Sequence, residues 1–68
     1  MAQMFPVASS MINAVGYDPE SQTLEVEFSN GRTYTYEGVP QSTFDGMMGA
    51  QSVGKFFISN IKNVYRQS

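Results

Sequence analysis

The residues that could do chemistry gather where the second half of the chain begins, at Gly49, Ser52, Gly54 and Lys55. Their spacing matches all but the last position of the phosphate-binding loop of NTPases, which requires Ser or Thr where this chain has Phe56. The pattern also follows a predicted helix rather than a buried strand, so we exclude an NTPase. A simpler anion site remains, because Ser52, Gly54 and Lys55 open a helix whose free backbone N–H groups favour a phosphate. The alternative is that Ser52 only caps the helix and Gly54 only allows close packing.

Residues suited to catalysis are few. The chain contains no Cys and no His, which removes the commonest nucleophiles and bases and the ligands that zinc prefers. Glu25 and Glu27 share one strand face and could do acid–base chemistry, but such pairs are more typical of a solvated face. The serines have no partner to activate them except Lys55. We therefore expect no enzyme, no metal site and no cofactor.

Tyr34 and Tyr36 could stack on bases, as sheet aromatics do in RNA-binding modules, or they could belong to the core. The answer depends on the hairpin loop before them. A two-residue loop Asn30-Gly31 places both rings on the polar face, whereas a three-residue loop with Gly31 in the left-handed conformation places them on the apolar face. We favour the three-residue loop and a core position, because so small a core cannot leave two large rings outside.

Charge is divided unevenly along the chain. Residues 1–45 hold all six acids and one base, Arg32, whereas residues 46–68 hold Lys55, Lys62 and Arg66 and no acid. This division is compatible with an anion site on the second half, although basic residues also favour the last turns of a helix and water. Strong nucleic-acid binders make roughly 6 to 10 phosphate contacts, so four bases against six acids favour a ligand with one or two phosphates over RNA.

The elements that must position these residues follow from periodicity and turn residues. Alternation and β-branched residues predict strands over residues 10–17, 23–28 and 32–37. Pro40 at the first helical position, with Phe44, Met47 and Met48 behind it, predicts a short helix. After Ser52 a stripe at helical spacing predicts a second helix; its members are Val53, Phe56, Phe57, Ile61, Val64 and Tyr65. The prediction is an α+β fold: a three-stranded antiparallel meander followed by two short helices packed on one face.

Length and composition limit the other possibilities. At 68 residues the chain is predicted to be one domain spanning residues 1–68, with residues 1–6 as a loosely held leader. Such a core is thin and disulfides are impossible without Cys, so we expect a homo-oligomer. The longest apolar runs have two or three residues, which predicts a soluble, cytoplasmic protein without a membrane segment.

The order of several short motifs resembles a known small family. They are Ser9-Ser10-x-Ile12, Val15-Gly16-Tyr17-Asp18, Leu24-x-Val26-x-Phe28-x-x-Gly31, Tyr34-x-Tyr36, Val39-Pro40, Ala50-x-Ser52-x-Gly54-Lys55-Phe56-Phe57, Ile61-Lys62 and Tyr65. Together they resemble the KTSC domain, named for the C-terminus of some lysyl-tRNA synthetases and also found as a free-standing bacterial or phage protein. Relatives often carry Asn where this chain has Ile58, which puts any ligand contact of that Asn in doubt here. The resemblance implies little about function, and RNA binding is only suggested.

Three hypotheses follow. The leading one is a non-enzymatic, oligomeric module that captures a phosphate-bearing small ligand such as a nucleotide at Ser52, Gly54 and Lys55, assisted by Tyr34, Tyr36, Arg32, Lys62 and Arg66. The second is an RNA-binding accessory of translation. The third is a protein-interaction module that contacts a partner or a twin subunit through Met4, Phe5 and Met11.

Overall fold

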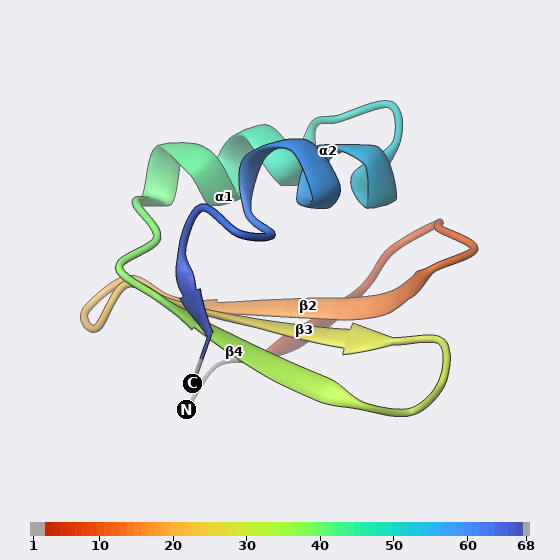
Figure 1. Ribbon diagram of the computed structural model, residues 1–68, viewed down its shortest axis with the longest axis horizontal. Coiled ribbons are helices and arrows are strands. Elements are labelled where there is room, and N and C mark those ends of the chain that lie inside the picture. The colour runs from red at the N-terminus through yellow and green to blue at the C-terminus, as the bar shows by residue number, and fades with distance from the viewer. Residues whose placement is uncertain (1–2, 68) are drawn as a thin grey trace.

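The backbone forms one antiparallel sheet with both helices on the same face, as the computed structural model shows (Figure 1). The structure describes residues 3–67. Five strands lie side by side in sequence order: β1 (Met4–Pro6), β2 (Ile12–Asp18), β3 (Thr23–Phe28), β4 (Thr33–Glu37) and β5 (Arg66–Gln67). Helices α1 (Gln41–Met48) and α2 (Val53–Asn60) lie between β4 and β5 in the chain. The predicted α+β class is confirmed, with five strands where three were predicted.

The extra strands come from the two ends of the described chain. Residues 4–6 pair with β2, and Val7 extends the ladder by donating its N–H to the carbonyl of Asn13 at 3.0 Å. Of the predicted leader, residues 4–6 form β1 beside β2, while residues 1–2 lie outside the described residues. At the other end β5 pairs with the last two residues of β4.

The second helix is shorter than its apolar stripe predicts. It begins at Val53, capped by Ser52, and ends at Asn60. Asn63 then adopts a positive φ of 66°, a conformation that Asn tolerates better than most residues and that turns the chain back toward the sheet. As a result Val64, predicted to belong to the buried stripe, is 61% exposed. The first helix is preceded by Pro40 as its N-cap rather than as its first helical residue.

The hairpin between β3 and β4 uses the three-residue loop. Gly31 has a φ of 88° and donates its N–H to the carbonyl of Phe28, whose own N–H bonds the carbonyl of Arg32 at 2.8 Å. Val26 consequently faces Tyr34, and Leu24 faces Tyr36, so both tyrosines lie on the apolar face. The preferred register is confirmed.

The core lies between that face and the helices. Apolar side chains from the sheet, from the connection to α1 and from both helices are almost fully removed from water: Ile12, Val15, Leu24, Val26, Tyr36, Val39, Met47, Val53, Phe57 and Ile61. Burial of these side chains is the main stabilising contribution, at roughly 1.5–3 kcal/mol for a fully buried aliphatic or Phe side chain. The helices do not fill the whole face, and the space they leave positions the candidate site.

Candidate functional site

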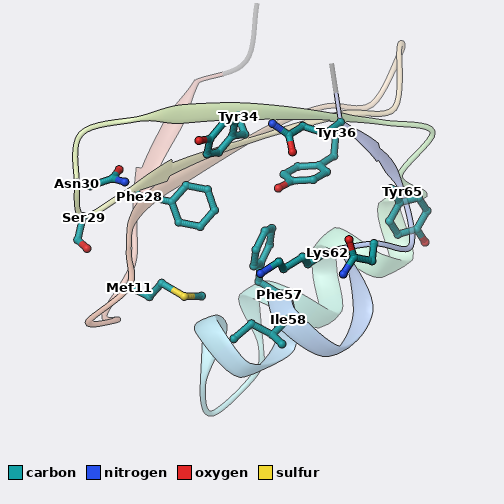
Figure 2. Close-up of a pocket in the computed structure, with 12 residues that line it drawn as sticks. Met11, Phe28, Ser29, Asn30, Tyr34, Tyr36, Phe57, Ile58, Lys62 and Tyr65 are labelled. Atoms are coloured by element: carbon teal, nitrogen blue, oxygen red, sulfur yellow. The ribbon is translucent and has the colours of Figure 1, made fainter.

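A hollow with a volume of about 590 Å³ lies between the β3–β4 hairpin and the end of α2. Strands and helix contribute opposite walls, and the turn after α2 contributes a third side (Figure 2). We call it the aromatic pocket; it is lined by Met11, Phe28, Ser29, Asn30, Tyr34, Tyr36, Phe57, Ile58, Lys62, Asn63, Tyr65 and Gln67.

The aromatic rings are held by edge-to-face contacts. Phe57 of α2 meets Phe28 with ring centroids 5.3 Å apart and Tyr36 with centroids 5.4 Å apart. Phe28 also meets Tyr34 edge-on at 5.5 Å. Such edge-to-face contacts are favourable by about 0.5–1.5 kcal/mol each beyond the area they bury, so they hold the rings in place along the pocket. Because Tyr36 and Phe57 are only 5% and 3% exposed, the inner end of the pocket is formed by the core itself.

One cation serves this pocket. Lys62, in the turn after α2, extends into it beside Phe57 (Figure 2). The lining residues of the described chain include no aspartate or glutamate. Burial, and to a smaller extent Tyr34, raises the pKa of the Tyr36 phenol, so this group is neutral near pH 7. The pocket therefore offers an apolar interior, one positive charge and several neutral hydrogen-bonding groups.

The predicted phosphate residues lie elsewhere, at a smaller hollow of about 390 Å³ where α2 begins. The Ser52 hydroxyl accepts the backbone N–H of Lys55 at 3.2 Å, so this donor already has a partner. Gly54 is buried, and a Cβ there would lie 3.4 Å from both Met11 Cε and Ser9 Oγ. The hydrogen bond to Lys55 favours the alternative stated above for Ser52, that it is a cap, whereas the contacts at Gly54 are of ordinary van der Waals length.

The structure therefore divides the predicted site residues between several places. Tyr34, Tyr36 and Lys62 meet in the aromatic pocket, whereas Ser52, Gly54 and Lys55 line the second hollow. The side chains of Met11 and Ile58 contribute to both hollows.

Neither predicted arginine lines either hollow. Arg32 lies in the hairpin beside the aromatic pocket, and its N–H bonds the Asn30 side chain at 2.9 Å. Arg66 lies on β5, opposite Glu37 of β4. The sequence analysis placed Phe57 in the apolar stripe of the second helix and identified neither Phe57 nor Phe28 as a pocket wall. The signal that could have identified Phe28 is its place in the apolar alternation of β3, on the face to which the favoured register assigns Tyr34 and Tyr36.

The described residues hold no group of three or more His, Cys, Asp or Glu side chains that could bind a metal ion. Glu25 and Glu27 lie opposite Thr35 and Thr33 in the ladder, which puts them on the sheet face away from the helices. Within residues 3–67 we also find no helix long and apolar enough to cross a membrane.

Comparison with known proteins identifies relatives that share nearly the whole chain. The sequence profile of the KTSC domain matches residues 8–65. A protein of Tsukamurella paurometabola is 44% identical over 63 residues, covering 93% of this chain and 94% of its own length. The crystal structure of a KTSC domain protein from Yersinia pestis superposes with a TM-score of 0.96 at 40% identity, covering 100% of this chain and 96% of the other. A lysine–tRNA ligase of Nostoc sp. is 37% identical over 57 residues, which are 84% of this chain and 10% of the ligase.

Proposed function

The chain belongs to the KTSC domain family, and we propose that it is a non-catalytic binding module whose aromatic pocket captures a ligand with a planar apolar group beside a negative charge. A nucleotide carries both features in one small molecule, a base and a phosphate. This keeps the ligand chemistry expected from the sequence and moves its site from the start of α2 to the aromatic pocket. Lys62 replaces Lys55 as the residue that meets the phosphate.

The observation that supports this proposal is the pocket's volume together with its lining. Small-molecule sites commonly measure roughly 300–1,000 Å³ and are mostly apolar, with a few polar groups that orient the ligand. The aromatic pocket, at about 590 Å³, falls within that range and combines aromatic walls with one lysine. A base that slides beside Phe28 and Tyr34 gains stacking contacts worth about 1–3 kcal/mol.

The small number of positive charges favours a single phosphate over a longer nucleic acid. Lys62 is the only charged side chain among the described residues that line the pocket. Arg32 in the hairpin and Arg66 on β5 lie outside it, and the chain has two more acids than bases. Counterion release therefore contributes little, and we expect nucleotide affinity to decline weakly with salt.

RNA binding is the second candidate, and one comparison favours it. The matched lysine–tRNA ligase of Nostoc sp. acts on tRNA, as its name says, and this chain is similar to 10% of that protein. If the domain binds tRNA, its affinity must fall steeply with added salt, because phosphate contacts release counterions. A titration of tRNA at two salt concentrations separates this candidate from the first.

The direct test is calorimetric titration of purified protein with adenosine, guanosine, cytidine and uridine monophosphates. Lys62→Gln should weaken binding of the best ligand about tenfold, the usual effect of losing one charge-assisted contact. Lys55→Gln is the matched control, because it removes an equal charge from the same helical region but outside the aromatic pocket. Absence of binding at millimolar nucleotide, or a loss caused by Lys55→Gln alone, contradicts the proposal.

We also propose self-association, which the thin core of so small a chain favours. Among exposed apolar side chains, Phe5 on β1 is 43% exposed and available to a twin subunit. Native mass spectrometry of the chain and of a Phe5→Ser variant measures this directly. A monomeric native mass would exclude a homo-oligomer, and a retained nucleotide would appear in the same spectrum as added mass.

A further inference from the structure

The outer edge of β4 is only partly covered. Strand β5 is two residues long and faces Tyr36 and Glu37 alone. Toward the hairpin, within the described part of the chain, Thr33 has β3 on one side and no strand on the other. A sheet edge of this kind presents unpaired backbone groups to solvent and can accept another strand.

The hydrogen-bond pattern of the hairpin shows which backbone groups are available. The Phe28 N–H donates to the carbonyl of Arg32. Hydrogen-bonded pairs recur at every second residue of an antiparallel ladder, so on β4 the residues that bond to β3 are Tyr34 and Tyr36. Thr33 belongs to a non-hydrogen-bonded pair, so its N–H and C=O point away from β3. These two groups are the donor and acceptor that an added strand needs.

The available edge borders the aromatic pocket. The side chains of Tyr34 and Tyr36 hang from β4 into the pocket, above Phe57 and Ile58 of α2 (Figure 2). In a strand added beside β4, successive side chains alternate between the two faces of the sheet. The residue opposite Tyr34 would direct its side chain toward the pocket, while the residue opposite Thr33 would bond the backbone and point to the other face.

Charge determines which kind of segment fits. The positive side chains near the available edge are Lys62 in the pocket and Arg32 next to Thr33 in the hairpin. No acid of the described chain lines the pocket, and Glu25 and Glu27 occupy the opposite face of the sheet. A segment bearing a carboxylate is therefore favoured over a basic one.

We propose that the outer edge of β4 at Thr33 and the aromatic pocket together bind an extended peptide that carries a bulky apolar side chain next to a carboxylate, added as an antiparallel strand in line with β5. This deepens the proposed function and rests on it, since both use the aromatic pocket. Main-chain hydrogen bonds to Thr33 hold the peptide, and the pocket selects the side chain. A second copy of the chain fits less well by way of β1, because Pro6 there has no N–H to donate.

The experiment uses hexapeptides that alternate threonine with Trp, Phe or Leu and end in a free carboxylate, each with a C-terminal amide twin. The chain contains no Trp, so the fluorescence of a tryptophan peptide reports on the peptide alone. We expect binding by the Trp or Phe carboxylate peptides and about tenfold weaker binding by the amide twins, because the amide removes the charge facing Lys62 and Arg32.

Two variants at one position test the strand contact. Thr33→Pro removes the available N–H without touching the β3 ladder and should weaken peptide binding about tenfold, whereas Thr33→Val keeps the N–H and should not. Amide proton exchange at Thr33 should slow when peptide is added. A heteronuclear NMR spectrum with the other amides unmoved establishes that Thr33→Pro remains folded.

The outcomes separate this inference from the function on which it rests. Nucleotide binding that survives Thr33→Pro, together with peptide binding that it abolishes, supports both. If nucleotide binds but no peptide does at millimolar concentration, or Thr33→Pro binds peptide as well as Thr33→Val, the strand contact is wrong and the proposed function stands. If peptide binds in the manner described and no nucleotide does, the pocket is a peptide site and the nucleotide ligand is wrong.

Discussion

Two aromatic clusters lie under the same sheet face, and only one of them is closed. At one end Tyr17 stacks on Phe44 of α1, with centroids 4.9 Å apart and an angle of 10° between the rings, and the Tyr17 hydroxyl bonds the carbonyl of Val39. At the other end Phe28, Tyr34, Tyr36 and Phe57 meet edge-on around a hollow of about 590 Å³.

The difference shows that aromatic content alone does not indicate a binding site. In the closed cluster the ring faces cover each other and the polar tip has a partner within the domain. In the open cluster the rings meet edge to face beside the hollow, and the Tyr34 hydroxyl has no hydrogen-bond partner within residues 3–67, which leaves it for a ligand. Substitutions should therefore affect stability at the closed cluster and binding at the open one, except where a ring also belongs to the core.

Phe57 is that exception and should give the largest effect. It is 3% exposed and supports both Phe28 and Tyr36. Phe57→Ala leaves a cavity under both, and we expect a loss of about 3–5 kcal/mol in the free energy of unfolding, measured by urea denaturation. Phe57→Leu is the milder companion if the alanine variant does not fold. A loss below about 1 kcal/mol would mean that the inner end of the pocket is not part of the core.

Tyr17→Phe tests the closed cluster. The change removes one hydroxyl and leaves the Val39 carbonyl without that donor. We expect a loss of about 1 kcal/mol in the free energy of unfolding and no change in ligand affinity. An altered affinity would show that the two ends of the sheet are coupled, which is contrary to the comparison.

The raised pKa values of two tyrosines predict that the free energy of unfolding depends on pH, and Tyr17→Phe tests this. Burial raises the pKa of the Tyr17 phenol above its ordinary value, with smaller contributions from Asp45 and Asp18, and burial also raises that of Tyr36. A group whose pKa is raised by folding stabilises the protein fully below its unfolded pKa, about 10, and this stabilisation is lost as the pH rises above it. Stability should therefore fall above about pH 10, and less steeply in Tyr17→Phe than in the unaltered chain. Urea titrations between about pH 8 and about pH 11 measure both slopes.

The parts of this arrangement that the sequence predicted depend on local rules. Asn30 and Gly31 specify the hairpin, and apolar alternation in β3 specifies which face of the sheet is buried. Together they predicted the face on which Tyr34 and Tyr36 lie. The Ser52 cap likewise depends on its own neighbours, and its bond to the Lys55 N–H is present.

The rest depends on contacts that no local pattern encodes. Strands of three and two residues, such as β1 and β5, show no periodicity and exist because β2 and β4 offer edges. The pocket was missed because the apolar stripe predicts a helix through Tyr65, whereas α2 ends at Asn60 and a left-handed Asn63 redirects the chain. That early end places Lys62 beside the hairpin aromatics instead of on a solvated helix face.

Gly54→Ala refines the contrast between the aromatic pocket and the start of α2. The added Cβ would make contacts of ordinary length with Met11 and Ser9, 3.4 Å from each. Alanine favours a helix over glycine by about 0.5–1 kcal/mol, so we expect the variant to be slightly more stable by thermal or urea unfolding. Unchanged nucleotide affinity is expected as well, and its loss would return the phosphate site to the start of α2.

Tyr34→Phe should have the smallest effect on stability, and it is the counterpart of Tyr17→Phe. Within residues 3–67 we find no hydrogen bond from the Tyr34 hydroxyl, and the ring keeps its edge-on contact with Phe28 when the oxygen is removed. The free energy of unfolding should change by less than about 0.5 kcal/mol, whereas ligand affinity should fall several-fold if the hydroxyl bonds the ligand. Urea unfolding and calorimetric titration of the two variants side by side make the measurement. Equal losses of stability in both would mean that the Tyr34 hydroxyl is hydrogen-bonded within the domain as the Tyr17 hydroxyl is. That result would contradict the proposal that the pocket leaves this hydroxyl for a ligand.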